Sequence, residues 1–586
     1  MPFLPISKEE IDKLGWEAPD IVLITPDAYV DHPAFAMAVI GRYLEKKGFK
    51  VAILSAPDYR NPKEFAGLGK PKICFAISCG NMDSMINKYT HNKKPRNQDD
   101  FSPGGKLLNR PDKTLITYSA CAKAAFKDVP VIVGGIEATM RRFVHYDYWS
   151  DAVKKPLILD SRADILVYGM GEKNAAEIAE RLRAGKNIKE IRDLPGTSYA
   201  LGASEKIPED SLILPSFEEI SEDKEKFLEM TKTIHENLNP FCSCVLVQKA
   251  GTKNAVINPP SPPLTSSEMD EIYDLPYERR PHPSYKEKIP AFETVKNSII
   301  SHRGCFGGCS FCSLGHHQGK FIQSRSFNSV KKEAEKLAVQ NKGKAVISDL
   351  GAPSANMYLM GGKDFSICMK CKRESCLHPS VCGNLNYSHE NLKKLLKEVS
   401  AVKGIKKVFI ASGIRPDLAL KDIEYVEILS KEHTSGMLKL APEHTDPKIL
   451  NSMKKPPIEI FLEFSAKFFQ FSGKCAKEQY LSLYFISAYP GTDLKKAVET
   501  AVFLKKHNIK PLQINDFLPA PGEYATAVYY CGKDPLTKEP VYSAKTESER
   551  KMHRALMQYF KKENIPLILK ALKLSGRTDL IPFFLR

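Results

Sequence analysis

The sequence predicts an α/β protein in which an N-terminal doubly wound parallel sheet is followed by a C-terminal partial (β/α)6 barrel. Short, continuous apolar runs alternate with helical patterns over the first 185 or so residues, which is typical of a parallel sheet with helices on both faces. A proline-rich stretch interrupts this alternation, and a second series with six expected strands follows it. Such a series fits a barrel or partial barrel with its chemistry at the carboxyl ends of the strands.

Five apolar runs are the expected strands of the N-terminal sheet, and a helical pattern from Ala36 to Leu44 follows the first of them. Any ligand of a doubly wound sheet is expected at the carboxyl ends of its strands. Polar residues after the first and fourth runs are therefore candidates for binding a polar or anionic part of a substrate, although helix capping and surface exposure also explain them. The expected strands are 20–25, 50–55, 72–78, 129–135 and 164–169. The polar candidates are Asp27, Asp31, His32, Glu137, Arg141 and Arg142.

Residues 257–290 contain eight prolines. Proline removes a backbone donor and disfavours helices and central strands, so this stretch is expected to be a semi-rigid linker or an extended wrap. The strands expected after it are 297–302, 344–349, 406–412, 436–441, 480–487 and 511–517. Helices are expected between them, for example at 329–340, 389–399 and 416–429.

These patterns divide the chain into four expected parts. The first is an N-terminal α/β domain, the second is a connecting region with the proline-rich stretch, the third is the barrel with a cysteine-rich insertion at 363–386, and the fourth is a helical tail. Their expected bounds are 1–200, 201–290, 291–560 and 561–586.

Composition excludes several classes of protein. Apolar residues make up 42% and charged residues 26% of the chain, which is typical of a globular protein and not of a disordered one. No run of about 18 uncharged apolar residues occurs, and the N-terminus lacks an apolar signal segment, so we expect a cytoplasmic protein that does not enter a membrane. The 86 basic and 69 acidic residues give a net charge of +17. This surplus permits nucleic-acid binding, but interleaved lysines and glutamates favour a solvated, lysine-rich surface.

Three cysteines follow the first strand of the second series, in the segment Gly304-Cys-Phe-Gly-Gly-Cys-Ser-Phe-Cys312. Three thiolates on one glycine-rich loop can ligate three irons of a cubane iron–sulfur cluster and leave the fourth iron open to a small molecule. A structural zinc ion is the competing interpretation, with His316 or His317 as the fourth ligand. The loop after the first strand of a barrel is a position typical of an active site.

This cysteine pattern resembles that of the radical S-adenosylmethionine (SAM) superfamily, and further segments resemble its YgiQ-type family from about residue 20 to beyond residue 575. In the N-terminal half these segments are Asp27–Pro33, Gly134–Ala138, Arg141–Phe143, His145–Trp149 and Val167–Glu172. In the C-terminal half they are His317–Gly319, Phe321–Ser326, Ser354–Tyr358 and Asp516–Phe517.

The resemblance implies that Cys305, Cys309 and Cys312 ligate a [4Fe-4S] cluster whose open iron chelates SAM. One electron delivered through the cluster would cleave SAM to a 5′-deoxyadenosyl radical, and this radical would abstract hydrogen from a substrate. The resemblance also implies an electron donor such as flavodoxin or ferredoxin. It does not name the substrate.

Five further residues are candidates for contacting SAM. The resemblance places Phe311 near the adenine, although its ring would also shield the cluster from water. The glutamate that the superfamily often has after the second strand is absent here, and a backbone carbonyl near Gly351 would take its place. Ser412 and Arg415 follow the third strand and suit ribose or carboxylate, and Glu443 follows the fourth. Loop capping is the alternative for these strand-end residues.

A second cysteine group, Cys368-x2-Cys371-x4-Cys376-x5-Cys382, follows the second strand. Four thiols within fifteen residues suffice for a structural zinc ion or an auxiliary iron–sulfur cluster, and the sequence does not choose between them. Free thiols in a loop are the alternative, although they would be open to oxidation.

The N-terminal domain resembles the cobalamin-binding fold that precedes many radical SAM cores. The usual Asp-x-His-x-x-Gly motif is not satisfied, because Asp31 and His32 are adjacent. Cobalamin is therefore not predicted.

Three functional hypotheses follow. The leading one is a radical SAM enzyme of unknown substrate. A second keeps the radical chemistry but modifies tRNA, which predicts salt-dependent RNA binding. A third is a non-enzymatic zinc or iron–sulfur protein that binds nucleic acid, which is possible but not favoured. Reductive SAM cleavage separates the first hypothesis from the third.

Overall fold

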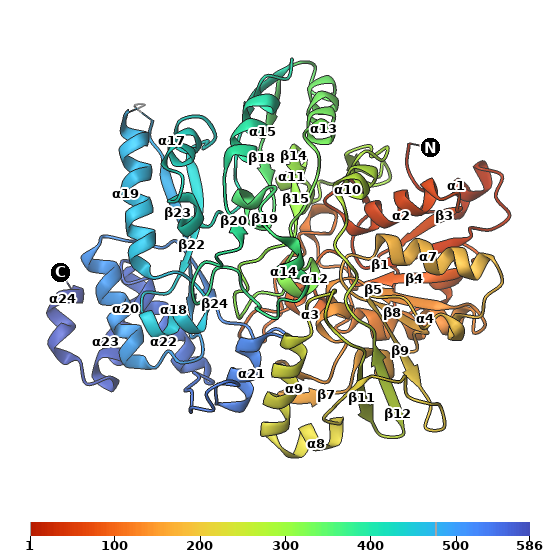
Figure 1. The fold of residues 1–586 in the computed structure, drawn as a ribbon, viewed down its shortest axis with the longest axis horizontal. Coiled ribbons are helices and arrows are strands. Elements are labelled where there is room, and N and C mark those ends of the chain that lie inside the picture. The colour runs from red at the N-terminus through yellow and green to blue at the C-terminus, as the bar shows by residue number, and fades with distance from the viewer. Residues whose placement is uncertain (1, 475–476, 586) are drawn as a thin grey trace. The chain divides into compact units, whose positions relative to one another are not determined.

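The computed structural model describes residues 2–474 and 477–585, which form two compact units (Figure 1). The first unit comprises residues up to 300 together with 316–319 and 366–372. The second comprises 301–315, 320–365 and the chain from 373 onward. The expected division into four parts stays a prediction.

The first unit is built on a nine-stranded sheet whose parallel part confirms the five expected strands. These strands lie in the order β3-β1-β4-β5-β8, with parallel pairing throughout. This is the doubly wound order in which the connection changes direction between β1 and β4, so the switch point lies there. The strands are β1 (Ile21–Thr25), β3 (Val51–Ser55), β4 (Cys74–Ser78), β5 (Val131–Gly134) and β8 (Ile165–Val167).

The sheet continues beyond residue 200, where the sequence analysis expected a connecting region. β9 (Thr197–Leu201) pairs antiparallel with β8, and β12 (Lys253–Ile257) pairs antiparallel with β9. β11 (Leu246–Ala250) and β10 (Leu212–Leu214) complete the edge. The N-terminal sheet is therefore mixed and larger than the apolar runs predicted.

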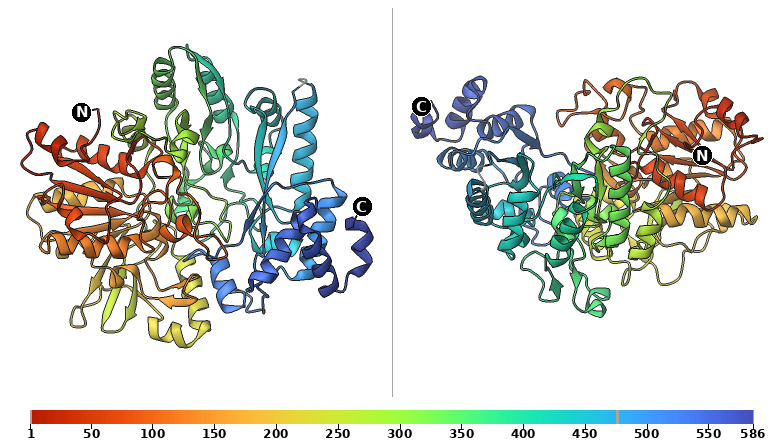
Figure 2. Two further views of the ribbon diagram at one scale, coloured as in Figure 1. Left: turned by 180° about the vertical axis from the view of Figure 1, so that it is seen from behind. Right: turned by 90° about the horizontal axis from the view of Figure 1, so that it is seen from above.

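Helices cover both faces of the parallel strands, as expected for a doubly wound sheet (Figures 1 and 2). α2 (Ala36–Lys46) and α7 (Glu172–Arg183) share one apolar cluster with Leu23 of β1. On the opposite face, α4 (Thr114–Ala125) contacts β4 and β5. All residues of β1 are buried, which explains why its run is continuously apolar.

Part of the proline-rich stretch packs on the first unit. Between Pro263 and Pro276 it forms helix α10 (Ser266–Tyr273), whose Met269 and Ile272 lie in the same apolar cluster as α2. The expectation that this stretch sustains no helix is wrong, because the prolines leave one proline-free window of sufficient length.

The second unit has the parallel strands of a partial barrel. β17 (Ala345–Ile347) pairs with β21 (Ile405–Val408). A parallel triplet is formed by β22 (Met437–Glu443), β23 (Tyr480–Ser487) and β24 (Gln513–Asp516). The first expected strand is divided into β14 (Ser298–Ile300), which is counted with the first unit, and β15 (His302–Arg303) of the second unit, which pairs with β16 (Gln323–Ser324).

Helices alternate with these strands. α13 (Phe327–Gln340) and α15 (Glu390–Ser400) match their predicted ranges closely. The single helix expected at 416–429 is wrong, because α16 (Pro416–Ala419) ends before Asp422, whose side chain caps the start of α17 (Ile423–Glu432). The α-helices that follow are α18 (Pro447–Ser452), α19 (Ile458–Lys474), α20 (Leu494–Lys506), α21 (Tyr524–Cys531), α22 (Glu547–Met557), α23 (Ile565–Leu574) and α24 (Ile581–Leu585).

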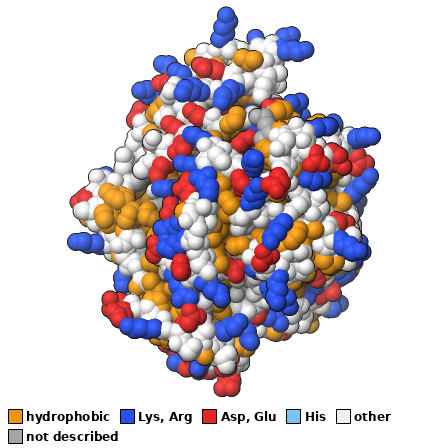
Figure 3. Space-filling view, turned by 90° about the vertical axis from the view of Figure 1, so that its right-hand side faces the viewer, with side chains coloured by type: hydrophobic (Ala, Val, Ile, Leu, Met, Phe, Trp, Pro, Cys, Tyr) orange, Lys and Arg blue, Asp and Glu red, His pale blue; other side chains and the backbone are white. Residues whose placement is uncertain are grey.

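Charges of both signs are interspersed on one face of the molecule. On the face seen in Figure 3, Lys and Arg side chains alternate with Asp and Glu side chains. None of the described helices combines the length and the apolar character that crossing a membrane requires.

A buried ion pair fixes α2 to the first unit. The Arg42 guanidinium bonds to the Asp31 carboxylate, and both side chains are fully buried. Arg42 also bonds to Glu45 and to the Pro2 carbonyl. Asp31 is thus a structural partner of Arg42 and not a capping residue.

We predict that Arg42→Met lowers the free energy of unfolding by about 3–5 kcal/mol, because it leaves the Asp31 charge buried and uncompensated. Denaturant unfolding of the full chain measures this. The matched control is Arg60→Met, which breaks the exposed pair with Asp58 and should cost no more than about 1 kcal/mol. Equal losses in both variants would contradict a structural role for the buried pair.

A second prediction concerns pH. Burial lowers the pKa of His302 to about 3, so the folded state favours neutral imidazole. The resulting stability is present above the ordinary pKa of about 6.5 and is lost as the pH falls toward the folded pKa. His302→Gln should therefore flatten the fall in unfolding free energy between about pH 6.5 and about pH 5, by an amount on the order of 2 kcal/mol. Other buried histidines titrate in both proteins and cancel. Parallel curves would refute the prediction.

Candidate functional site

The three cysteines of the glycine-rich loop lie directly after β15 in the second unit. Gly304 and Gly308 have φ values of +88° and +61°, which glycine adopts without strain. A Cβ at Gly308 would lie 2.7 Å from the Glu374 carbonyl oxygen. A Cβ at Gly307 would lie 3.4 Å from Cys305 Sγ and 3.9 Å from Cys309 Sγ. The backbone therefore curls around Gly307 with two thiols beside it.

Ser310, between the second and third cysteines, anchors this loop. Its hydroxyl donates to the Ser452 carbonyl at 2.7 Å and lies 2.7 Å from the Tyr489 hydroxyl. Its amide donates to the Met453 carbonyl at 3.3 Å, and its carbonyl accepts from the Ala525 amide at 2.8 Å. These partners come from the end of α18, the loop after β23 and the start of α21. The loop is thus fixed at the carboxyl end of the strand triplet.

Phe311 packs into an aromatic row. Its ring meets Tyr489 edge to face at 6.2 Å, and Tyr489 in turn meets Phe517 at 5.3 Å. Such edge-to-face contacts hold the rings in defined orientations. The contact of Phe311 with SAM stays a prediction.

The loop thiols sit in a buried, charged environment. Burial, together with the neighbouring Cys309 thiol, raises the pKa of Cys305 and of Cys312. Arg415 and Lys455 act in the opposite direction on the pKa of Cys305. Three thiols beside cationic groups are a suitable donor set for an iron–sulfur cluster. Within residues 2–474 and 477–585, no group of three or more His, Cys, Asp or Glu side chains is arranged around a common point as it would be around a metal ion.

Arg415 lies against this loop. Its Nε and Nη2 donate to the two Asp417 carboxylate oxygens at 2.9 and 2.7 Å. Its Nη1 donates to Cys309 Sγ at 3.8 Å. The structure therefore brings Arg415 together with a cysteine of the loop, which the sequence analysis did not anticipate.

Gly351 and Ser412 are engaged with neighbouring groups. The Gly351 carbonyl, which we expected to face SAM, accepts from the Ser301 amide at 3.0 Å and from its hydroxyl at 3.3 Å. The Ser412 hydroxyl donates to the Asp349 carboxylate, which also accepts from the Ser412 amide at 3.0 Å. Both residues tie strand ends together here, and their contact with SAM stays a prediction.

Glu443 ends β22 in a strained, buried position. Its φ of +69° is unusual for a residue with a side chain. Burial raises the pKa of its carboxyl, and Lys455, with its Nζ 3.8 Å from Oε1, opposes that rise. Strained backbone of this kind clusters at functional sites. The contact of Glu443 with SAM stays a prediction.

The second cysteine group is divided between the units. In the first unit, the Asn239 side-chain amide donates to the carbonyls of Cys368, Met369 and Cys371 at 3.0, 3.2 and 2.9 Å. These bonds shape the Cys368–Cys371 turn. Asn239 is buried, and no motif in the sequence indicates its role.

In the second unit, Cys376 and Cys382 pack with Cys305 against the apolar cluster around Phe306. The Cys376 amide donates to the Phe306 carbonyl at 3.0 Å, and the Ser375 hydroxyl donates to the Gly307 carbonyl at 2.7 Å. This part of the insertion therefore packs directly on the cysteine loop. A metal at the four cysteines stays a prediction.

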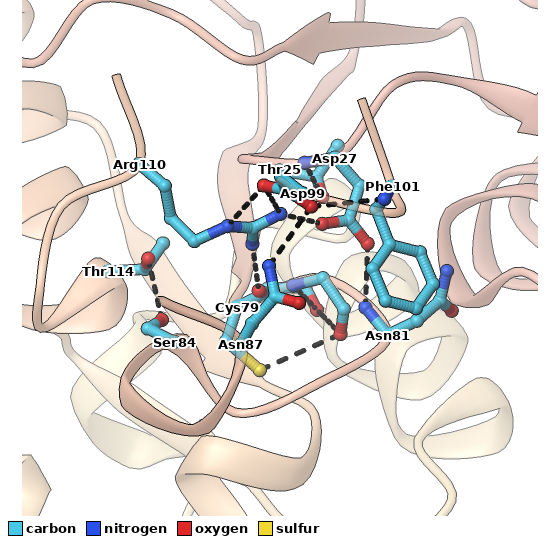
Figure 4. A network of polar contacts seen from close by, with 12 residues as sticks. Thr25, Asp27, Cys79, Asn81, Ser84, Asn87, Asp99, Phe101, Arg110 and Thr114 are labelled. Atoms are coloured by element: carbon cyan, nitrogen blue, oxygen red, sulfur yellow. Dashed lines mark hydrogen bonds and ion pairs between the residues drawn. The ribbon is translucent and has the colours of Figure 1, made fainter. Parts of the chain in front are cut away.

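The switch point of the first unit is filled by a buried polar network (Figure 4). Arg110 bonds to Asp27, which follows β1, at 2.7 Å and to Asp99 at 2.8 Å. Asp27 also accepts from the Asn81 amide at 2.7 Å. Asp27 is among the polar residues expected here, whereas no local pattern indicates Arg110 and Asp99, because both come from the long connection after β4.

Little space is left beside this network. The cavity lined by Asp27, Phe35, Met37 and Asn81 has a volume of only about 10 Å³, far below the roughly 300–1,000 Å³ of small-molecule sites. The polar residues after β5 are also engaged, since Arg141 pairs with Asp83 and Glu137 accepts from the Ser84 hydroxyl. The side chains after β1, β4 and β5 are therefore engaged with one another at the switch point.

Ser310→Ala tests the anchorage of the cysteine loop. The substitution removes the hydroxyl bonds to Ser452 and Tyr489, so we expect an unfolding free energy lower by about 1–3 kcal/mol. We also expect less iron and sulfide retained per chain after anaerobic reconstitution and gel filtration. Ser221→Ala, which removes a hydroxyl bond on an exposed helix, is the control. Equal retention and stability in the two variants would show that Ser310 does not hold the loop.

Family comparisons cover nearly the whole chain. The model described as "Radical SAM N-terminal" matches residues 3–298, and the model described as "Radical SAM superfamily" matches 299–504. A "Domain of unknown function (DUF3362)" matches residues 512–584.

Curated relatives are similar over the same length. A UPF0313 protein of Methanocella arvoryzae is 45% identical over 580 residues, covering 99% of this chain and 96% of that protein. UPF0313 protein RPA0679 of Rhodopseudomonas palustris is 44% identical, covering 99% and 90%. UPF0313 protein YgiQ of Escherichia coli strain K12 is 41% identical, covering 99% and 87%.

Solved structures show a weaker likeness. The radical SAM methyltransferase TsrM from Kitasatospora setae matches with a TM-score of 0.48 at 15% identity, covering 87% of this chain and 75% of that chain. The cobalamin-dependent radical SAM enzyme OxsB matches with a TM-score of 0.46 at 10% identity, covering 87% and 55%.

Proposed function

The chain belongs to the UPF0313 family of radical SAM proteins and is a radical SAM iron–sulfur enzyme, and we propose that Cys305, Cys309 and Cys312 hold its [4Fe-4S] cluster. When bound, the cluster and SAM together supply the reductive cleavage of SAM to a 5′-deoxyadenosyl radical that abstracts hydrogen from the substrate. The observation that carries this assignment is the anchorage of Ser310 at the carboxyl end of the strand triplet.

The residues around the loop would hold and shield the bound groups. Gly307 and Gly308 give the backbone its close curvature, and Phe311 with Tyr489 forms an apolar wall beside it. Arg415 and Lys455 offset the negative charge of thiolates. Glu443 lies beside Lys455 and would face a polar part of SAM. A zinc ion with His316 or His317 as its fourth ligand is the alternative for these cysteines.

A substrate and a reductant complete the reaction, and a small acidic electron carrier such as flavodoxin or ferredoxin would suit the net charge of +17. The second cysteine group would hold an auxiliary iron–sulfur cluster or a zinc ion. Nucleic acid is the less favoured substrate, because positive and negative side chains are interspersed on the face seen in Figure 3 and form no continuous basic stripe there.

Production of 5′-deoxyadenosine tests the assignment. We expect protein that is reconstituted anaerobically with iron and sulfide, then given dithionite and SAM, to release 5′-deoxyadenosine. The triple variant C305A/C309A/C312A should lose the product, because no ligand for the cluster remains on the loop. Cys121→Ala, which removes a thiol of α4 in the first unit, should retain it.

The outcomes separate the alternatives. Product that persists in the triple variant would refute the cysteine assignment. A cluster that forms and binds SAM without cleaving it would indicate that substrate is needed for the chemistry. One zinc ion per chain, bound at the loop in protein that forms no cluster, would support the zinc interpretation instead.

A further inference from the structure

We propose that Arg415 is a positioning residue that donates a hydrogen bond to the Cys309 thiolate and thereby raises the reduction potential of the cluster. The inference rests on the proposed function, because it requires the cluster to be bound by Cys309. It departs from the expectation that Arg415 binds the ribose or carboxylate of SAM.

The orientation of the guanidinium carries the proposal. The Asp417 carboxylate accepts hydrogen bonds from both Nε and Nη2 of Arg415, and this two-point geometry fixes the plane of the guanidinium. This leaves Nη1 directed at Cys309 Sγ, 3.8 Å away. Gly307 lies beside this contact, since a Cβ there would stand at van der Waals distance, 3.4 Å, from Nη1.

The backbone of Arg415 is held as firmly as its side chain. Asn356 accepts from the Arg415 amide at 2.8 Å and donates to the Arg415 carbonyl at 2.9 Å. The Asn356 amide also lies 3.3 Å from His389 Nε2, and the His389 ring stacks on Tyr425 at 4.4 Å. Arg415 is only 6% exposed, so turning its guanidinium toward another ligand would break the two bonds to Asp417.

A donor at a ligand sulfur affects the cluster in one direction. Hydrogen bonds to cluster sulfurs withdraw electron density from the metal and favour its reduced state, which raises the potential. Low water access strengthens this effect. Because the Arg415–Asp417 ion pair has no net charge, Arg415 acts on the cluster through the hydrogen bond from Nη1 to the Cys309 sulfur and not through a net positive charge.

The experiment uses the full chain with its cluster reconstituted anaerobically, in two variants. Arg415→Gln replaces the guanidinium whose Nη1 reaches Cys309 Sγ with a shorter, neutral amide, and it leaves Asp417 as an uncompensated anion. Loss of the guanidinium donor and gain of a net negative charge therefore lower the potential together. The double variant R415Q/D417N keeps the net charge of the wild type, so its shift reports the lost, directed donor alone. Redox titration followed by electron paramagnetic resonance measures the potential without SAM, and equilibrium dialysis measures SAM binding.

We expect a potential more negative than that of the wild type in both variants, with the larger shift in R415Q. Iron and sulfide contents and the SAM dissociation constant should stay within about twofold of the wild type. An unchanged potential in the double variant would overturn the proposal. A SAM affinity lowered tenfold or more at unchanged potential would instead restore the expected SAM contact and would equally overturn it.

Two controls keep the result interpretable. If the double variant does not fold, judged by its thermal melting, Arg415→Lys takes its place, because it keeps the cation and loses the planar two-point fork; its potential should also fall. Lack of a cluster in the wild type would show that the proposed function itself is wrong, whereas a wild-type cluster with an unshifted variant contradicts only the role of Arg415.

Discussion

The anchorage of the cysteine loop is the constraint on which the arrangement at the carboxyl end of the strand triplet depends. Ser310 bonds to Ser452 and Tyr489 through its hydroxyl, and to Met453 and Ala525 through its backbone. Because these partners follow different parallel strands, the loop holds its position only if the strand triplet holds its register. The glycines on either side permit this close packing, since a Cβ at Gly308 would collide with the segment around Glu374.

Around this loop, charge is balanced in pairs. Arg415 is neutralised by Asp417, and Lys455 lies near Glu443. Each cation reduces the electrostatic cost of placing thiolates in a buried setting, and each carboxylate limits the positive charge that the interior has to hold. The strained backbone at Glu443 is consistent with this packing, because residues in sparsely populated conformations persist only where the surroundings fix them.

In the first unit, side chains fill the switch point of the sheet. The doubly wound order would leave a crevice between β1 and β4, but the long connection after β4 returns Arg110 to Asp27 and Asp99. A buried arginine between two carboxylates is costly to disturb. The switch point is therefore part of the first unit's own stability, and the extension of the sheet through β9 to β12 adds to the same core.

The sequence by itself determined the alternation of strands and helices, the two parallel-strand regions and the cysteine loop after the first strand of the second region. These features follow from local patterns, because buried parallel strands must be continuously apolar and a cluster loop needs closely spaced thiols. Only the tertiary structure decided the partners of Ser310, Arg110 and Arg415. Arg415 and Cys309 are 106 residues apart, and no local pattern encodes a contact at that separation. No expected strand covered the four added strands at 197–257. Three of them, β9, β12 and β11, pair antiparallel, and antiparallel strands do not show the continuous apolar run by which buried parallel strands are found.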